Sequence, residues 1–152
     1  MRDNVSKLGR VLSALALPAA NIGAINGPDN QLSAHNAATL YILAGTWTDG
    51  IHTIVIQEAP DVSGAPGAYT PVAATDLVAF TATSATDHTP VKIGSSQPAV
   101  ISSAATALNQ RIGYIGGQPW IRAVVTASGT TTGAVYDAVW VNGEPRMMPD
   151  YV

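Results

Sequence analysis

The sequence predicts an all-β protein: a single antiparallel β-sandwich or open barrel with an extended N-terminal arm and a short C-terminal tail. Three observations support this prediction. Short runs of alternating apolar and polar residues recur along the chain, turns rich in Gly and Pro separate them, and no strand–helix–strand pattern appears. A length of 152 residues is typical of one domain. We divide the chain into an arm (1–36), a β domain (37–142) and a tail (143–152).

The arm contains one short apolar run, residues 11–20, followed by turn-forming residues. Residues 6–17 fit a short helix that Pro18 would end. Lys7 and Arg10 ahead of the apolar run also resemble the start of a signal peptide, but the run is short and Pro18 breaks it, so we favour no signal peptide. The arm has little to bury against itself. We therefore expect it to lie along a neighbouring chain or along its own domain.

The strands of the β domain are predicted from the alternation of apolar and polar residues. The predicted strands are residues 37–46, 52–59, 77–80, 91–93, 111–115, 120–127 and 134–143. The first of these strands is apolar on both faces. Asp49 and Gly50 predict a tight hairpin turn after it, because Gly tolerates the positive φ that such turns require. Residues 128–133 predict a second hairpin loop, with Arg122 and Asp137 as a cross-strand pair.

The residues suited to chemistry form no recognisable catalytic or metal-binding pattern. His35, His52 and His88 are far apart, and none has a second ligand two or four residues away. Along one strand, His52 and Glu58 would be about 20 Å apart at ~3.3 Å per residue, so they cannot share a proton. Asp49 fits the turn that it occupies. With no cysteine, nucleophile elbow or phosphate-binding loop, we expect no enzyme, catalytic residue, metal or cofactor.

The composition argues against nucleic-acid and membrane partners. Charged residues make up 11% of the chain, well below the ~25% typical of soluble domains. The seven basic residues are scattered and the net charge is −3, which leaves no basic footprint for nucleic acid. No run approaches the ~20 apolar residues that a membrane-spanning helix needs. A weakly charged surface rich in small residues suits a chain packed against other chains.

Three stretches carry a resemblance to a known family: GTWTDGIHTIVIQEAPD at 45–61, YTPVAATDL at 69–77 and RIGYIGGQPWIRAVVTASGTTTGAVYDAVWVNGEPRMMP at 111–149. They resemble small virion proteins of tailed bacteriophages, encoded among the head genes near the major capsid protein. The resemblance covers about residues 40–148, and 1–20 more loosely. It implies a decoration or cement protein that binds the outer surface of the capsid and clamps adjacent capsomers.

The resemblance also implies partners and a location. The partners would be the major capsid protein and further copies of the chain, as a trimer or dimer. The protein would be made in the host cytoplasm and would reside on the surface of the phage head. Apolar residues of the arm and tail, and a tryptophan expected to be exposed at the first hairpin, are the candidate contacts. They are Val11, Leu12, Leu15, Leu17, Trp47, Met147, Met148 and Tyr151.

Other hypotheses remain open. One stays within the virion: a head-completion, tail or baseplate protein. Another is a carbohydrate-binding β-sandwich that uses Trp47 and a neighbouring aromatic residue. The last is a hydrolase built on Asp49, His52 or Asp137, which would require converging carboxylates. Trp120 and Trp140 lie in predicted strands, so we expect them in the core or at a subunit interface.

Overall fold

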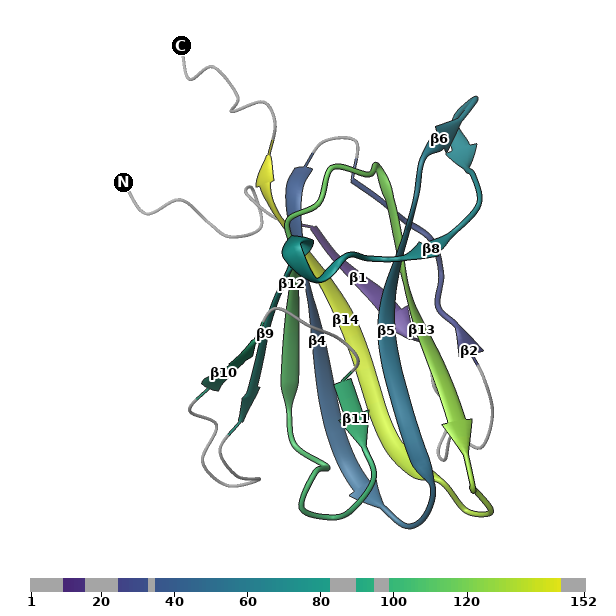
Figure 1. Cartoon of the computed structure of the whole chain (residues 1–152), viewed down its shortest axis with the longest axis vertical. Coiled ribbons are helices and arrows are strands. Elements are labelled where there is room, and N and C mark those ends of the chain that lie inside the picture. The colour runs from purple at the N-terminus through teal and green to yellow at the C-terminus, as the bar shows by residue number, and fades with distance from the viewer. Residues whose placement is uncertain (1–9, 16–24, 33–34, 83–89, 95–98, 146–152) are drawn as a thin grey trace.

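The structure is a computed structural model that describes residues 10–15, 25–32, 35–82, 90–94 and 99–145. Within these ranges the regular elements are β-strands, apart from one short 3-10 helix, η1 (Ala74–Asp76). None of these residues belongs to a helix that is long and apolar enough to cross a membrane. The strands form two antiparallel sheets that pack face to face (Figure 1), so the predicted all-β sandwich is confirmed.

Sheet A has six strands in the order β1-β14-β4-β12-β9-β10. Their bounds are β1 (Arg10–Leu15), β14 (Ala134–Pro145), β4 (His35–Trp47), β12 (Gln110–Tyr114), β9 (Leu77–Ala82) and β10 (Pro90–Gly94). Sheet B has the order β11-β5-β13-β2, with β3 also paired to β13 and β8 to β5. Their bounds are β11 (Ala99–Ile101), β5 (Ile51–Ala59), β13 (Trp120–Ser128), β2 (Ile25–Asn26), β3 (Asn30–Gln31) and β8 (Thr70–Pro71). A separate ribbon pairs β6 (Asp61–Val62) with β7 (Ala65–Pro66).

The core lies between the two sheets and is made of alternate residues of each strand, as the period of two requires. The largest fully buried side chains are Leu32, Leu40, Ile42, Ile54, Ile56, Leu77, Ile101, Ile112, Tyr114, Ile121 and Trp140. Full burial of one such apolar side chain contributes ~1.5–3 kcal/mol. The core therefore fixes which face of each strand points inward.

Both loops predicted as hairpins instead carry the chain from one sheet to the other. β4 and β14 pair with each other in sheet A, whereas β5 and β13 pair in sheet B. Arg122 and Asp137, predicted as cross-strand partners, therefore lie in different sheets, opposite Gln57 and Leu43 respectively. The prediction failed because alternation shows which face of a strand is buried but not which strand it pairs with.

The segment predicted as an arm contributes strands to both sheets. β1 pairs with β14 at the edge of sheet A, and β2 and β3 pair with β13 in sheet B. Ala14 and Leu32 are buried in the core. The helix expected over residues 6–17 is thus a strand in its described part, where it pairs with an otherwise open edge of the sheet. The sheets extend beyond both predicted limits of the β domain, since β14 runs to Pro145.

Candidate interaction surface

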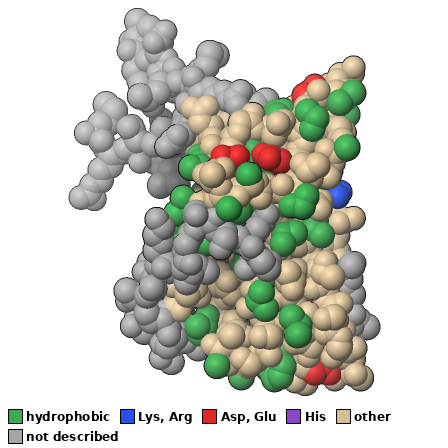
Figure 2. Space-filling model, in the orientation of Figure 1, with side chains coloured by type: hydrophobic (Ala, Val, Ile, Leu, Met, Phe, Trp, Pro, Cys, Tyr) green, Lys and Arg blue, Asp and Glu red, His purple; other side chains and the backbone are tan. Residues whose placement is uncertain are grey.

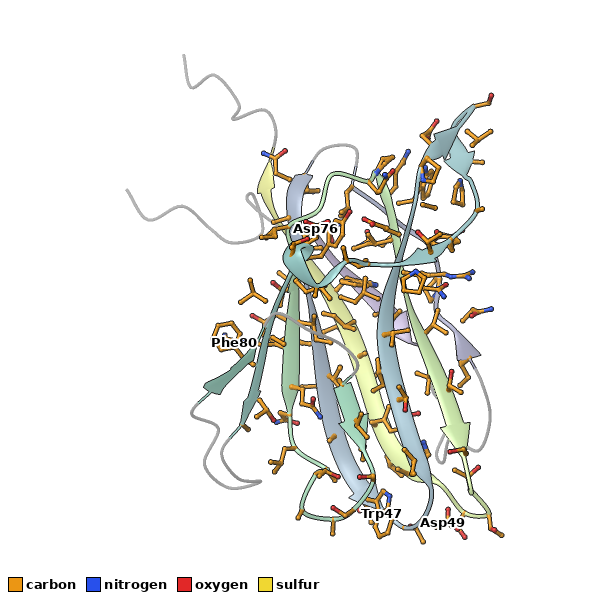
Figure 3. All side chains as sticks on the ribbon, viewed as in Figure 1. Trp47, Asp49, Asp76 and Phe80 are labelled. Carbon is orange, nitrogen blue, oxygen red and sulfur yellow. The ribbon has the colours of Figure 1, made fainter. Side chains whose placement is uncertain are left out.

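Asp49 joins two loops at one end of the sandwich (Figure 3). Its carboxylate accepts hydrogen bonds from the backbone N–H groups of Thr131, Thr132 and Gly133 at 2.6–3.2 Å. The bonds from Thr132 and then Gly133 hold the pKa of Asp49 below its usual range. The Asp-Gly turn therefore stabilises the junction between the two sheets, and the ionised carboxylate is the form that the junction favours.

His52 is buried between the sheets. Its Nε2 lies 3.1 Å from the carbonyl oxygen of Asp49, and its Nδ1 lies 3.3 Å from the hydroxyl oxygen of Tyr136. A carbonyl only accepts, so we assign Nε2 as the donor to Asp49; in that tautomer Nδ1 accepts from the hydroxyl of Tyr136. Farther along β5, Glu58 accepts a hydrogen bond from the hydroxyl of Tyr114 at 2.7 Å. His52 and Glu58 thus have separate partners.

The described residues contain no group of three or more His, Asp or Glu side chains placed to hold a metal ion. His88, one of the three histidines of the chain, lies outside these residues. The predicted cross-strand pair of Arg122 and Asp137 does not form either, because the two residues lie in different sheets.

Trp47 is half-buried and packs against the core, where the sequence predicted an exposed side chain. A β-bulge explains the difference. Ala44 lies opposite Tyr136 and Trp47 lies opposite Ala134, so β4 has one more residue than β14 over this stretch. The extra residue turns Trp47 inward, and its Nε1 donates a hydrogen bond to the carbonyl oxygen of Gly50 at 2.9 Å. The indole face is therefore not a free platform for a sugar.

The other predicted contacts divide into two groups. Three belong to the edge strand β1 and pair with β14: Val11, Leu12 and Leu15. Four lie outside the described residues: Leu17, Met147, Met148 and Tyr151. Their contacts with a partner remain a prediction.

The outer face of sheet A is an extended apolar surface that the sequence analysis did not single out. Its apolar members are Tyr41, Leu43, Val78, Phe80, Val135, Val139 and Val141, all of which point away from sheet B. Leu43 and Val135 are each 48% exposed. The sequence did carry a signal for this surface, because residues 37–46 are apolar on both faces. A strand of that kind is buried on both sides or exposes an apolar side.

The register of sheet A aligns four of its outward side chains in one row. Val139, Tyr41, Arg111 and Phe80 are neighbours across β14, β4, β12 and β9. Phe80 projects from β9 on the side away from sheet B (Figure 3). Two cavities of about 260 and 240 Å³ lie beside this row, and Tyr41, Phe80 and Arg111 line both. Gly113 lines the smaller one, where a larger residue would fill the space.

Arg111 is the cation of this row. Its guanidinium carbon lies 4.5 Å from the centre of the Phe80 ring, a cation–π contact. Its Nε is buried and has no hydrogen-bond partner among the described residues. A guanidinium group has five N–H donors. The group is therefore held in place by an aromatic ring but lacks an acceptor for Nε.

Arg122 lies on the outer face of sheet B and differs from Arg111 in its partners. Its guanidinium carbon lies 4.0 Å from the centre of the Tyr69 ring, and its Nε and Nη2 donate to Oε1 of Gln57 at 3.0 and 2.8 Å. The hydroxyl of Tyr69 donates to Asp29 at 2.7 Å, and burial followed by this bond raises the pKa of Tyr69. Arg122 thus has an acceptor within its own chain, Oε1 of Gln57, whereas Nε of Arg111 has none among the described residues.

No protein-family model matches this chain, and no curated protein matches it significantly. Among solved structures, the chain is similar to the crystal structure of the SPBc2 prophage-derived protein YomS. The identity is 12%, the similarity covers 88% of this chain and 91% of that chain, and the TM-score is 0.43. At this level the similarity carries no argument about the function of the present chain.

Proposed function

We propose that this chain is a non-catalytic structural protein of a tailed-phage particle, which binds the outer surface of the capsid and holds adjacent capsomers together. The observation that carries the proposal is the exposed apolar outer face of sheet A in a chain of which only 11% is charged. In the view of Figure 2, acidic and basic side chains of the described residues lie only at isolated places. A large exposed apolar patch marks a contact with another molecule. The sequence resemblance supports the phage head as the place of that contact.

Further exposed apolar side chains lie at the two ends of the sandwich. Val62 on the β6–β7 ribbon and Ile115 are each 58% exposed, and Ile51 at the other end is 50% exposed. The ribbon projects beyond the sheets (Figure 1). Asp61 holds it in place by accepting bonds from the backbone N–H of Gly64 and from Nε1 of Trp120, each at 2.9 Å. Several separate contact points on one rigid body make multivalent binding strong without any single tight site.

Copy number and location in purified particles test the proposal. Cryo-electron microscopy with quantitative mass spectrometry gives both quantities. We expect density on the outside of the shell at a symmetry axis of the capsid lattice, with a copy number that matches that axis. Density confined to the neck or tail would replace the capsid role by a head-completion, tail or baseplate role. Absence from the particle would refute a virion function and turn attention to carbohydrate binding.

A further inference from the structure

We infer that the outer face of sheet A is a contact between two copies of this chain, in which Arg111 of each copy pairs with Asp137 of the other. The inference rests on the proposed structural role and deepens it by naming the partner of this face. It starts from the guanidinium of Arg111, which lies against the Phe80 ring at the centre of an apolar surface and makes no hydrogen bond to a described residue. Because Nε itself is buried, the terminal Nη groups are the donors that a partner would meet. When such a surface is covered, a charge without a partner is costly, so the covering molecule must bring an acid.

The face itself contains a suitable acid. Asp137 is exposed and points outward from β14, opposite Leu43 of β4. One of its carboxylate oxygens accepts a bond from the backbone N–H of Ala138 at 2.7 Å, and a carboxylate has further acceptor sites. Arg111 lies on the other side of β4, opposite Tyr41. One face of one chain therefore presents both members of an ion pair, too far apart to pair with each other.

The register places the two charges for a symmetric pairing. They are two strands and two residues apart, which is roughly 12 Å at ~4.8 Å per strand and ~3.3 Å per residue. A two-fold axis that lies in the contact plane and crosses β4 between Tyr41 and Leu43 exchanges the positions of Arg111 and Asp137. Two copies related by that axis form two identical ion pairs. This is the self-complementarity that a two-fold dimer requires.

The area and the surroundings fit a stable dimer. β14, β4, β12 and β9 have 12, 13, 5 and 6 residues. At ~4.8 by ~3.3 Å per residue their outer face measures roughly 570 Å², so two copies bury on the order of 1,100 Å². That area is at the lower end of the range of specific protein contacts. Tyr41 and Leu43 lie between the two charges, Val139 lies next to Tyr41, and the three side chains would exclude water from the pairs. The Phe80 ring holds the guanidinium in place before the partner arrives, which limits the entropy lost on association.

Sedimentation velocity of the full chain over a range of concentrations tests the inference. We expect a dimer. Arg111→Asp and Asp137→Arg should each raise the dissociation constant by about 100-fold, because each places like charges together twice in the dimer. The double variant Arg111→Asp/Asp137→Arg should restore the dimer. Thr126→Asp adds a charge to the exposed outer face of sheet B and should leave the dissociation constant unchanged.

A monomer at all concentrations overturns the inference, and so does a dimer that resists both single reversals. If a reversed variant does not fold, as judged by circular dichroism, Arg111→Gln and Asp137→Asn provide milder tests, and each should weaken the dimer. A folded double variant that stays monomeric also overturns the pairing. The proposed function fails separately: a chain that dimerises as described but is absent from particles refutes only the virion role. A chain found on the shell as isolated monomers refutes only the dimer.

Discussion

Asn30 and Asn142 form a buried amide pair that ties the two sheets together, and its removal should be costly. The two side chains are 1% and 0% exposed, and each Nδ2 donates to the Oδ1 of the other at 2.8 and 3.0 Å. Asn30 belongs to β3, which pairs with sheet B, and Asn142 belongs to β14 of sheet A. Asn30→Ala deletes both hydrogen bonds and leaves the amide of Asn142 buried without them. The two bonds contribute ~1 kcal/mol each, and the orphaned amide carries a desolvation penalty of ~1–3 kcal/mol. We expect the free energy of unfolding to fall by about 3 kcal/mol, the low end of this ~3–5 kcal/mol sum.

Urea unfolding followed by tryptophan fluorescence measures this loss of free energy. In a thermal melt, the same loss should lower the melting temperature by about 6–12 °C, at ~2–4 °C per kcal/mol for a chain of this size. The double variant Asn30→Ala/Asn142→Ala loses the same two bonds only once and leaves no orphaned amide. It should cost about 2 kcal/mol, roughly 4 kcal/mol less than the sum of the two single changes. A single change that costs under ~1 kcal/mol, or costs that simply add, would refute the argument that satisfied buried amides hold the sheets together.

Three other predictions concern single positions. Asp49→Asn should lower the melting temperature at neutral pH and flatten its decline in acid. Backbone hydrogen bonds hold the pKa of Asp49 in the folded protein below 3.8. The carboxylate therefore stabilises the fold at any pH above its pKa in the unfolded chain, and this stabilisation is lost as the pH falls through its pKa in the folded protein. Melts from neutral pH down to about pH 2 check this, and an unchanged acid decline would contradict it. Ile54→Ala should cost ~2–5 kcal/mol in urea unfolding, because Ile54 is fully buried. Ile51→Ala on the same strand, where the side chain is 50% exposed, should cost under ~1 kcal/mol, and equal costs would refute the strand orientation. Gly50→Ala should cost at least ~1–2 kcal/mol, because Gly50 has φ +83° and the added Cβ would collide with the facing loop. Gly117→Ala, with open space around the added Cβ, should be close to neutral in the same thermal melts, and a larger loss there would contradict the argument.

The strands and their inward faces could be predicted because that information is local. In β13, for example, Ile121, Ala123 and Val125 alternate with more polar or larger neighbours, and all three are buried. Strand type and buried face depend on the residues of one segment and the two-residue period. For the same reason, the prediction that His52 and Glu58 cannot share a proton needed only the rise along a strand.

The pairing of strands and the joints between sheets could not be predicted, because they depend on residues far apart in the chain. Asp49 bonds to backbone groups more than 80 residues away, and Asn30 reaches Asn142 across 112 positions. No local pattern at Asp49 distinguishes a hairpin turn from a loop that crosses between sheets. The inward turn of Trp47 depends on a bulge that is defined only against the partner strand β14.

The outer face of sheet A could be predicted from the sequence only in part. Its apolar character is local, since β4 alternates between two apolar sets, and the inner set already accounts for the core. What is non-local is the row that places Arg111 beside Tyr41 and Phe80, and the distance from Arg111 to Asp137. Among the described residues, no further layer of the chain covers this second apolar set. The same face also holds a cation and, two strands away, an exposed acid, and the inferred second copy pairs with both at once.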